Sequence, residues 1–77
     1  MQTEYRAVAS FQVEDEATGN RQTLTHLKKF EVRHPHPGME TAGEIGGRLE
    51  LADGEIAARI DDNRFRAGER TFRRVLA

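Results

Sequence analysis

The stretch 5-YRAVASFQV-13 decides the fold, because apolar and polar side chains alternate along it. The odd positions from Tyr5 to Val13 hold only apolar side chains, and the even positions are polar except at Val8. A period of two is typical of a β-strand with one face on a core and the other in water. The stretch therefore predicts a half-buried strand near the N-terminus.

A second strand is predicted over residues 21–33, after an acidic, turn-forming loop. Leu24 and Leu27 have opposite parity, so a strand here requires a bulge near Lys28. A short helical turn over Thr23–Lys29 is the alternative, because the same leucines also fall at helical spacing. We favour the strand, paired with the first one in a long antiparallel hairpin.

The segment 34-HPHPG-38 ends the second strand in this interpretation, because proline cannot donate to a strand ladder. A short helix is predicted over Met39–Ile45, where the apolar residues lie at helical spacing. Pro37 can begin such a helix, and Gly46-Gly47 would end it.

Turn signals at short spacing predict a meander after the glycine pair. Asp53-Gly54 is a strong hairpin signal between two alternating segments, residues 48–51 and 55–61. The second of these segments places three apolar residues on one face: Ile56, Ala58 and Ile60.

The C-terminal segment fits either strands or a helix. As strands it covers residues 64–66 and 70–76, and we assign Phe65 and Phe72 to the core. A helix from about residue 67 is the alternative, because it would pair Glu69 with a basic residue one turn later. We favour the strands.

These segments predict a single domain over residues 1–77 with a small, mostly antiparallel β fold. A long N-terminal hairpin would pack with a C-terminal meander, joined by one short helix or loop. An α+β fold with a C-terminal helix is the alternative. About five strands in so short a chain leave exposed edges, and an edge strand is a template for another chain. We therefore expect a homodimer.

Composition excludes several classes of site. The chain has no cysteine, so it has no disulfide and no thiolate ligand or nucleophile, which fits a reducing compartment. No stretch approaches the roughly 20 apolar residues of a membrane span, and the first residues contain no apolar run of signal-peptide length. We expect a cytoplasmic protein without a membrane partner or a cofactor.

Patterns for catalysis and metal binding are weak. Ser10, the only serine, lies mid-strand without the glycine-flanked turn that exposes a hydrolase nucleophile. His34 and His36 could lie on one side of an extended segment, but their spacing fits no common zinc site. The adjacent carboxylates Asp61 and Asp62 are typical of a turn. We therefore expect neither an enzyme nor a metal site.

Arginine is unevenly distributed along the chain. Residues 1–58 carry six basic and ten acidic side chains, a charge of −4, whereas residues 59–77 carry six basic and three acidic side chains, a charge of +3. Guanidinium groups bind carboxylates or phosphates through paired hydrogen bonds. We predict that partner binding uses the arginine cluster, which consists of Arg59, Arg64, Arg66, Arg70, Arg73 and Arg74.

These features favour a small non-enzymatic protein-binding module, such as an adaptor, an inhibitor or a phage-type accessory protein. An exposed sheet edge would supply affinity, and the arginine cluster would select an acidic protein partner. The alternative is a nucleic-acid-binding protein that uses the same basic surface, although the net charge of −1 disfavours general affinity for nucleic acid.

Overall fold

A computed structural model describes residues 2–76, so Met1 and Ala77 of the predicted domain lie outside the described residues. Within this range the chain forms six strands and no helix. The strands are β1 (Gln2–Asp15), β2 (Arg21–His36), β3 (Met39–Leu51), β4 (Ile56–Asp61), β5 (Arg64–Ala67) and β6 (Arg70–Arg74). The prediction of a mostly antiparallel β fold is confirmed, and the α+β alternative is wrong.

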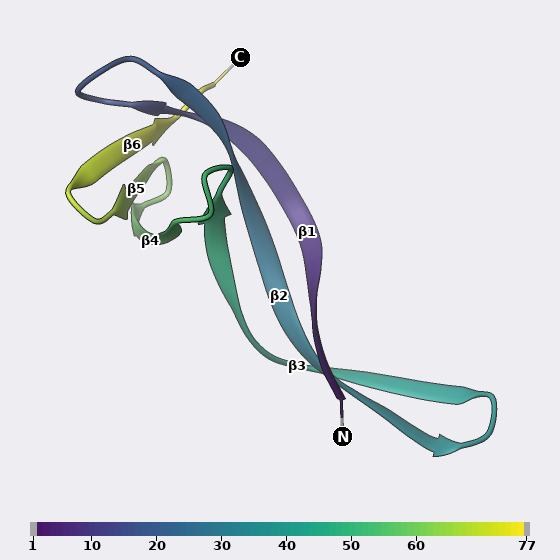
Figure 1. The fold of residues 1–77 in the computed structure, drawn as a ribbon. Coiled ribbons are helices and arrows are strands. Elements are labelled where there is room, and N and C mark those ends of the chain that lie inside the picture. The colour runs from purple at the N-terminus through teal and green to yellow at the C-terminus, as the bar shows by residue number, and fades with distance from the viewer. Residues whose placement is uncertain (1, 77) are drawn as a thin grey trace.

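The six strands follow one another around a closed barrel, and every neighbouring pair is antiparallel. Closure comes from β1 and β6, which pair where Val13 lies opposite Arg74 and Asp15 lies opposite Phe72. The first hairpin and the C-terminal meander therefore form one sheet, joined by the turns between consecutive strands (Figure 1).

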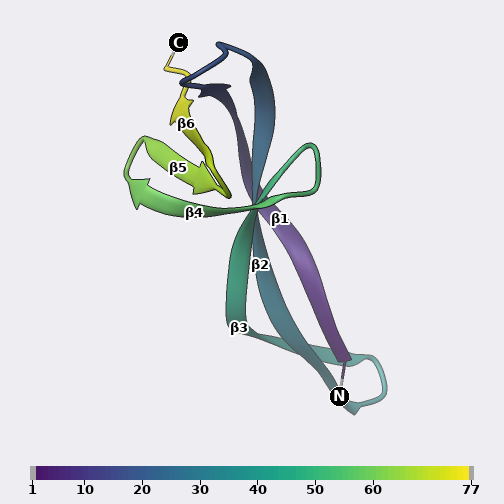
Figure 2. The same ribbon diagram turned by 60° about the vertical axis from the view of Figure 1, so that its left-hand side comes forward.

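The first three strands are too long for the barrel. They contain 14, 16 and 13 residues, whereas β4, β5 and β6 contain six, four and five. Their surplus length leaves the barrel as a three-stranded sheet, called the arm here, which consists of residues 2–8, 27–36 and 39–48 (Figures 1 and 2).

The arm makes the molecule elongated. Its principal extents are 52 × 25 × 21 Å and its radius of gyration is 15.5 Å, against about 11–12 Å for a compact chain of this length. The tip of the β2–β3 hairpin lies at the end farthest from the barrel, on the same side of the molecule as the N-terminus (Figure 1).

The hydrophobic core lies inside the barrel. Phe65 and Phe72 face each other across β5 and β6, and both are almost fully buried, as predicted. Leu24, Leu51 and Val13 complete the set of fully buried large side chains. Ala57 and Ala67 are also buried in this cluster, and the partly buried Phe11 and Leu49 pack against it.

The bulge predicted in β2 near Lys28 lies instead in the two neighbouring strands. The ladder positions of β2 run without interruption from Leu24 to Arg33, while β1 has an extra residue at Val8 and β3 has one at Ile45. Leu24 therefore points into the barrel, whereas Leu27 lies on the opposite face of β2. Bulges bend and twist a sheet; the one at Val8 lies where the barrel gives way to the arm, and the one at Ile45 lies within the arm.

The bulge at Val8 also changes which side of β1 faces the core. Ala9 and Phe11 pair with the β2 residues that continue the barrel interior, whereas Tyr5 and Ala7 pair with residues of the opposite face. Tyr5 is 44% exposed. The predicted apolar face of β1 is therefore correct at Phe11 and Val13, whereas Ala9 is exposed and the face before the bulge is the opposite one.

The helix predicted over Met39–Ile45 is wrong, because these residues belong to β3 and pair with β2. β2 also continues to His36 instead of ending at Arg33. A tight turn at residues 37–38 connects the two strands, and Gly38 adopts a φ of 79° there. That positive angle favours glycine over any residue with a side chain.

The C-terminal segment forms β5 and β6, so the strand prediction is confirmed and the helical alternative is wrong. The apolar face of β4 points away from the core: Ile56 and Ile60 are about half exposed, and Ala57 lies inside. The described residues contain no helix with the length and hydrophobicity needed to cross a membrane.

Candidate functional site

The arginine cluster divides between the outer wall and the ends of the barrel. Arg64 and Arg73 lie opposite each other on β5 and β6, and Arg66 follows two residues along β5 on the same outer face. Phe65, between them in the sequence, points into the core. The period of two along a strand accounts for this arrangement.

Two arginines of the outer wall bind acidic side chains from the β1–β2 hairpin. The Nε atom of Arg64 donates to Glu16 at 3.1 Å, and this hydrogen bond raises the pKa of Arg64. Arg73 donates to Glu14 at 3.2 Å. Arg66 differs, because its Nε atom donates to the backbone carbonyl of Gly68 at 3.0 Å. Both ion pairs link the hairpin to the meander across the outside of the barrel.

The other three arginines cover aromatic rings of the core. The guanidinium carbon of Arg59 lies 5.2 Å from the ring centre of Phe65, and that of Arg74 lies 4.3 Å from the ring centre of Phe11. The two rings are themselves 5.5 Å apart. Arg70 covers the ring of Phe72 at 5.2 Å. These are favourable cation–π positions.

Arg70 also binds two carboxylates of the β3–β4 turn, Asp53 at 2.9 Å and Glu55. The pKa of the Arg70 guanidinium is raised, mainly by its hydrogen bond to Asp53 and secondly by its hydrogen bond to Glu55. The pKa of Asp53 is lowered, first because the backbone N–H of Glu55 donates to it and second because Arg70 does. This network fastens the β3–β4 turn to β6.

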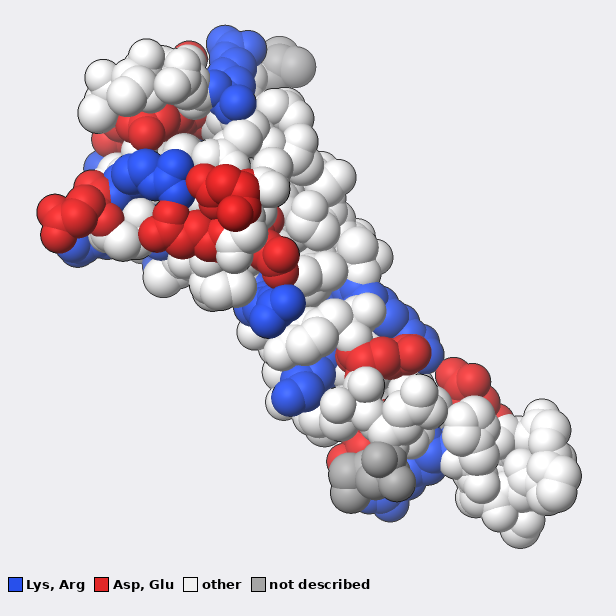
Figure 3. Space-filling model, in the orientation of Figure 1, with Lys and Arg blue, Asp and Glu red and all other residues white. Residues whose placement is uncertain are grey.

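Half of the arginine cluster is therefore paired with acids. Among residues 2–76, three of its members have no acidic side chain within ion-pair distance: Arg59, Arg66 and Arg74. On the face shown in Figure 3, acidic side chains gather over the barrel around a few basic ones, and basic and acidic side chains are interspersed along the arm. The excess of basic residues near the C-terminus does not produce a uniformly basic surface on this face.

The arm presents a second candidate surface, an exposed sheet edge of the kind expected from the sequence, whose place in the chain the sequence did not indicate. β1 pairs with β6 only through Val13–Asp15, and β3 pairs with β4 only through Leu49 and Glu50. Within the part of the chain that the structure describes, the outer edges of β1 over residues 2–8 and of β3 over residues 39–48 are consequently unpaired. Such edges present rows of free backbone donors and acceptors.

The arm is a single layer, so side chains on both of its faces reach solvent, although Val32 of β2 is buried. On one face Tyr5 lies beneath Arg48, whose guanidinium carbon is 4.3 Å from the ring centre. On the other face Phe30 lies beneath Arg6 at 5.0 Å. Ile45 remains 51% exposed. Cations thus cover the two aromatic rings of the arm, while aliphatic side chains remain in contact with solvent.

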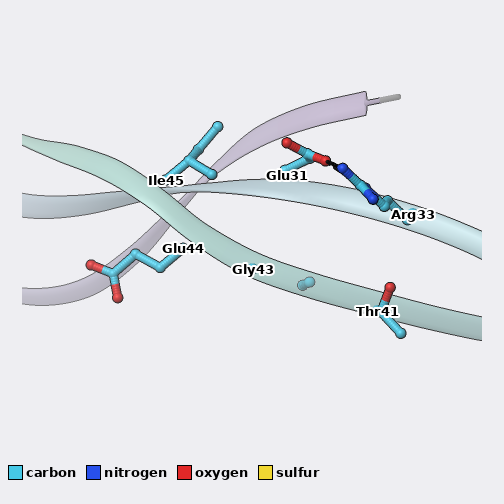
Figure 4. A pocket seen from close by; sticks show the side chains of 7 residues that line it. Glu31, Arg33, Thr41, Gly43, Glu44 and Ile45 are labelled. Carbon is cyan, nitrogen blue, oxygen red and sulfur yellow. Dashed lines mark hydrogen bonds and ion pairs between the residues drawn. The ribbon is translucent and has the colours of Figure 1, made fainter.

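A shallow hollow lies beside the bulge of β3 and the free edge of that strand. Ile45, Glu31 and Arg33 extend to the same side of the sheet, and Glu44 points to the opposite side (Figure 4). Glu31 and Arg33 form an ion pair along β2. The hollow is open to solvent and lined partly by backbone, which suits an extended chain better than a small ligand.

The groups considered for catalysis and metal binding are dispersed. Ser10 lies opposite Thr25 in the β1–β2 ladder, and His34 and His36 are exposed near the tip of the arm. Asp61 accepts a hydrogen bond from the N–H of Asn63 and so forms the predicted turn. Within residues 2–76, no three His, Asp or Glu side chains come close enough to hold a metal ion.

No known protein family, curated protein or solved structure matches this chain. Function must therefore be inferred from the residues and their geometry.

Proposed function

We propose that the protein is a small non-enzymatic protein-binding module that adds an extended segment of its partner to the free edge of β3. The supporting observation is that, among residues 2–76, no strand pairs with the outer edge of β3 from Met39 to Arg48. Main-chain hydrogen bonds to such an edge supply affinity, and the side chains alongside it supply specificity.

The composition of the β3 edge suits strand addition. Gly43 and Gly46 have open space where a side chain would project, so a partner strand can bring larger side chains close to the sheet. Ile45 offers an exposed aliphatic contact between them. The hollow beside Ile45 provides room for a side chain of the added strand.

The arginine cluster has a secondary role in this proposal. Arg59, Arg66 and Arg74 remain available to acidic groups of a partner, whereas the ion-paired arginines would first have to release their carboxylates. Charges at the rim of an interface mainly set specificity and the association rate. An adaptor, an inhibitor or a phage-type accessory protein would each use the arm and these arginines in this way.

Proline substitutions at adjacent positions of β3 test strand addition. Neighbouring residues of a strand direct their N–H groups to opposite sides, so one of Thr41 and Ala42 donates toward β2 and the other toward the free edge. Proline removes the N–H in either case. The proline variant that keeps its stability identifies the residue whose N–H points to the free edge. The proline variant at the adjacent position serves as the matched control.

The expected result is that the stable proline variant no longer captures the protein that the natural chain captures from lysate of its host. Retention of that protein by the stable variant would refute strand addition at β3. Labelled DNA and RNA at low salt test the nucleic-acid alternative, whose affinity would fall linearly with salt on logarithmic axes. Tight, salt-dependent binding to either nucleic acid would favour that alternative.

A further inference from the structure

The free edge of β1 differs from that of β3. Residues 3–7 of β1 contain neither glycine nor proline and pair regularly with β2. The β3 edge contains three glycines and a bulge at Ile45. A regular edge can pair with another strand along its whole length, whereas a bulge interrupts the register at one position. In Figures 1 and 2 no other segment lies along the outer side of β1 in the arm.

Symmetry restricts how two copies of this edge can pair. Two identical antiparallel strands are related by a twofold axis normal to the sheet, and side chains directly opposite each other share a face. Side chains alternate with a period of two, so one residue must lie opposite its own copy. On the regular part of the β1 edge the candidates for this axial position are the five residues from Thr3 to Ala7.

Charge selects among these positions. An axis at Glu4 would place two carboxylates opposite each other, and an axis at Arg6 would do the same with two guanidiniums. An axis at Tyr5 instead places Glu4 of each copy opposite Arg6 of the other copy, which gives two symmetry-related pairs of opposite charge. Opposite charges across a ladder stabilise it and like charges destabilise it. The remaining two positions form no pair of opposite charges.

We propose that two copies of this chain pair edge to edge through β1, antiparallel, with Tyr5 on the twofold axis. The necessary groups are accessible, since the side chains of Arg6 and Glu4 are 43% and 40% exposed and Tyr5 is 44% exposed. In the single chain Arg6 already contacts Glu4 and Glu40. Pairing of two copies adds a second set of contacts between the same two residue types across the ladder.

The dimer joins the two arms into one six-stranded sheet and leaves both β3 edges free. Five residues from each copy form a small interface, below the roughly 1,000 Å² of a stable specific complex, so the dimer is weak and concentration-dependent. It does not depend on the proposed binding of a partner at β3, because the two edges lie on opposite sides of the arm.

Single-cysteine variants test the register, because the natural chain has no cysteine. Tyr5→Cys alone should form a disulfide-linked dimer, since opposite Cβ atoms lie about 4.5–5.5 Å apart. Thr3→Cys or Ala7→Cys alone should cross-link at least about tenfold more slowly, because each would be about 13 Å along the strand from its own copy. A mixture of the Thr3 and Ala7 variants should cross-link again, because these two positions face each other.

Charge reversal tests the same register without a covalent bond. Glu4→Arg or Arg6→Glu alone should raise the dissociation constant about tenfold, and the double reversal should recover much of the loss because complementary charges face each other again. Glu31→Arg is the matched control, since Glu31 forms the same type of ion pair with Arg33 on the central strand of the arm. Sedimentation velocity provides the measurement.

The proposal is overturned if the natural chain stays monomeric up to about 1 mM. It is also overturned if Thr3→Cys or Ala7→Cys alone cross-links as fast as Tyr5→Cys, which would show another register. Either result leaves the proposed β3 site standing. Conversely, a Thr41 or Ala42 proline variant that keeps its partner would refute the β3 site and leave the dimer intact.

Discussion

Alanine substitution at two glycines of β3 should change stability in opposite directions. A Cβ atom added to Gly47 would lie 2.7 Å from the backbone carbonyl oxygen of Leu27, a distance that real Cβ atoms essentially never show. The obstacle is backbone on the central strand of the arm, so it cannot rotate away as a flexible side chain could. A Cβ atom added to Gly43 would meet nothing within 4 Å.

The difference between the two variants isolates the steric cost. Both substitutions reduce the backbone entropy of the unfolded chain, because alanine has fewer accessible conformations than glycine. This effect stabilises the fold by about 0.5–1 kcal/mol in each variant. Gly47→Ala must in addition push β3 away from β2, and overpacking of this kind costs about 1–3 kcal/mol. Gly43→Ala should therefore stabilise the fold and Gly47→Ala should destabilise it, with a difference of about 1–3 kcal/mol between the two.

Thermal and urea denaturation followed by circular dichroism measure both effects. In a domain of this size 1 kcal/mol corresponds to about 4–8 °C in Tm, so the variants should differ by at least about 4 °C. The measurements belong at low protein concentration, where association does not contribute to stability. If Gly47→Ala stabilises the protein as much as Gly43→Ala does, β2 and β3 do not approach each other at Gly47 as described.

Three further predictions concern the barrel. Phe65→Ala should cost about 3–5 kcal/mol and leave little folded protein by circular dichroism, because the ring is fully buried. The lowered pKa of Asp53 stabilises the fold above its usual value of 3.8, and this contribution is lost as pH falls through the lower folded value. The free energy of unfolding of the natural chain, measured by urea denaturation, should therefore fall between pH 4 and pH 2, and it should fall less in the Arg70→Met variant. Asp15→Ala should cost about 1–2 kcal/mol in urea denaturation, whereas Asp15→Asn should be nearly neutral, because the side-chain oxygen accepts from the N–H groups of Ala17 and Thr18.

The strands of the hairpin and the meander could be predicted because their polarity alternates, although helical alternatives stayed open for residues 23–29 and for the C-terminal segment. Residues 48–51 at the end of β3 were also predicted as a strand, but the earlier part of β3 was not, because Met39 and Ile45 lie at helical spacing and the glycines of that segment suggest a helix end. Its strand conformation comes from the ladder with β2, which pairs with it almost to the tip of the arm. Pairing between segments is a tertiary effect that a local pattern does not contain.

The faces of the strands were harder to predict than the strands themselves. Val8 stands out in the sequence as an apolar residue on the polar side, and in the structure it is the extra residue of a bulge. Polarity alone does not reveal that every residue before it changes face. In β4 the apolar stripe is outside and Ala57 is inside, because Phe65 and Phe72 leave space only for a small side chain.

The arginines near the C-terminus have a structural explanation that their sequence did not suggest. A six-stranded barrel has only a few layers of interior side chains, so the rings of the core lie close to its open ends. Arg59 and Arg74 cover two such rings, and Arg70 covers a third while it also holds the β3–β4 turn. A long side chain can shield a ring with its aliphatic stem and keep its charge in water. Selection for a basic binding surface is thus not needed to account for these three arginines. Arg66 differs, because its one hydrogen bond is to a backbone carbonyl. Its charge is therefore the one in the arginine cluster that a partner can use most readily.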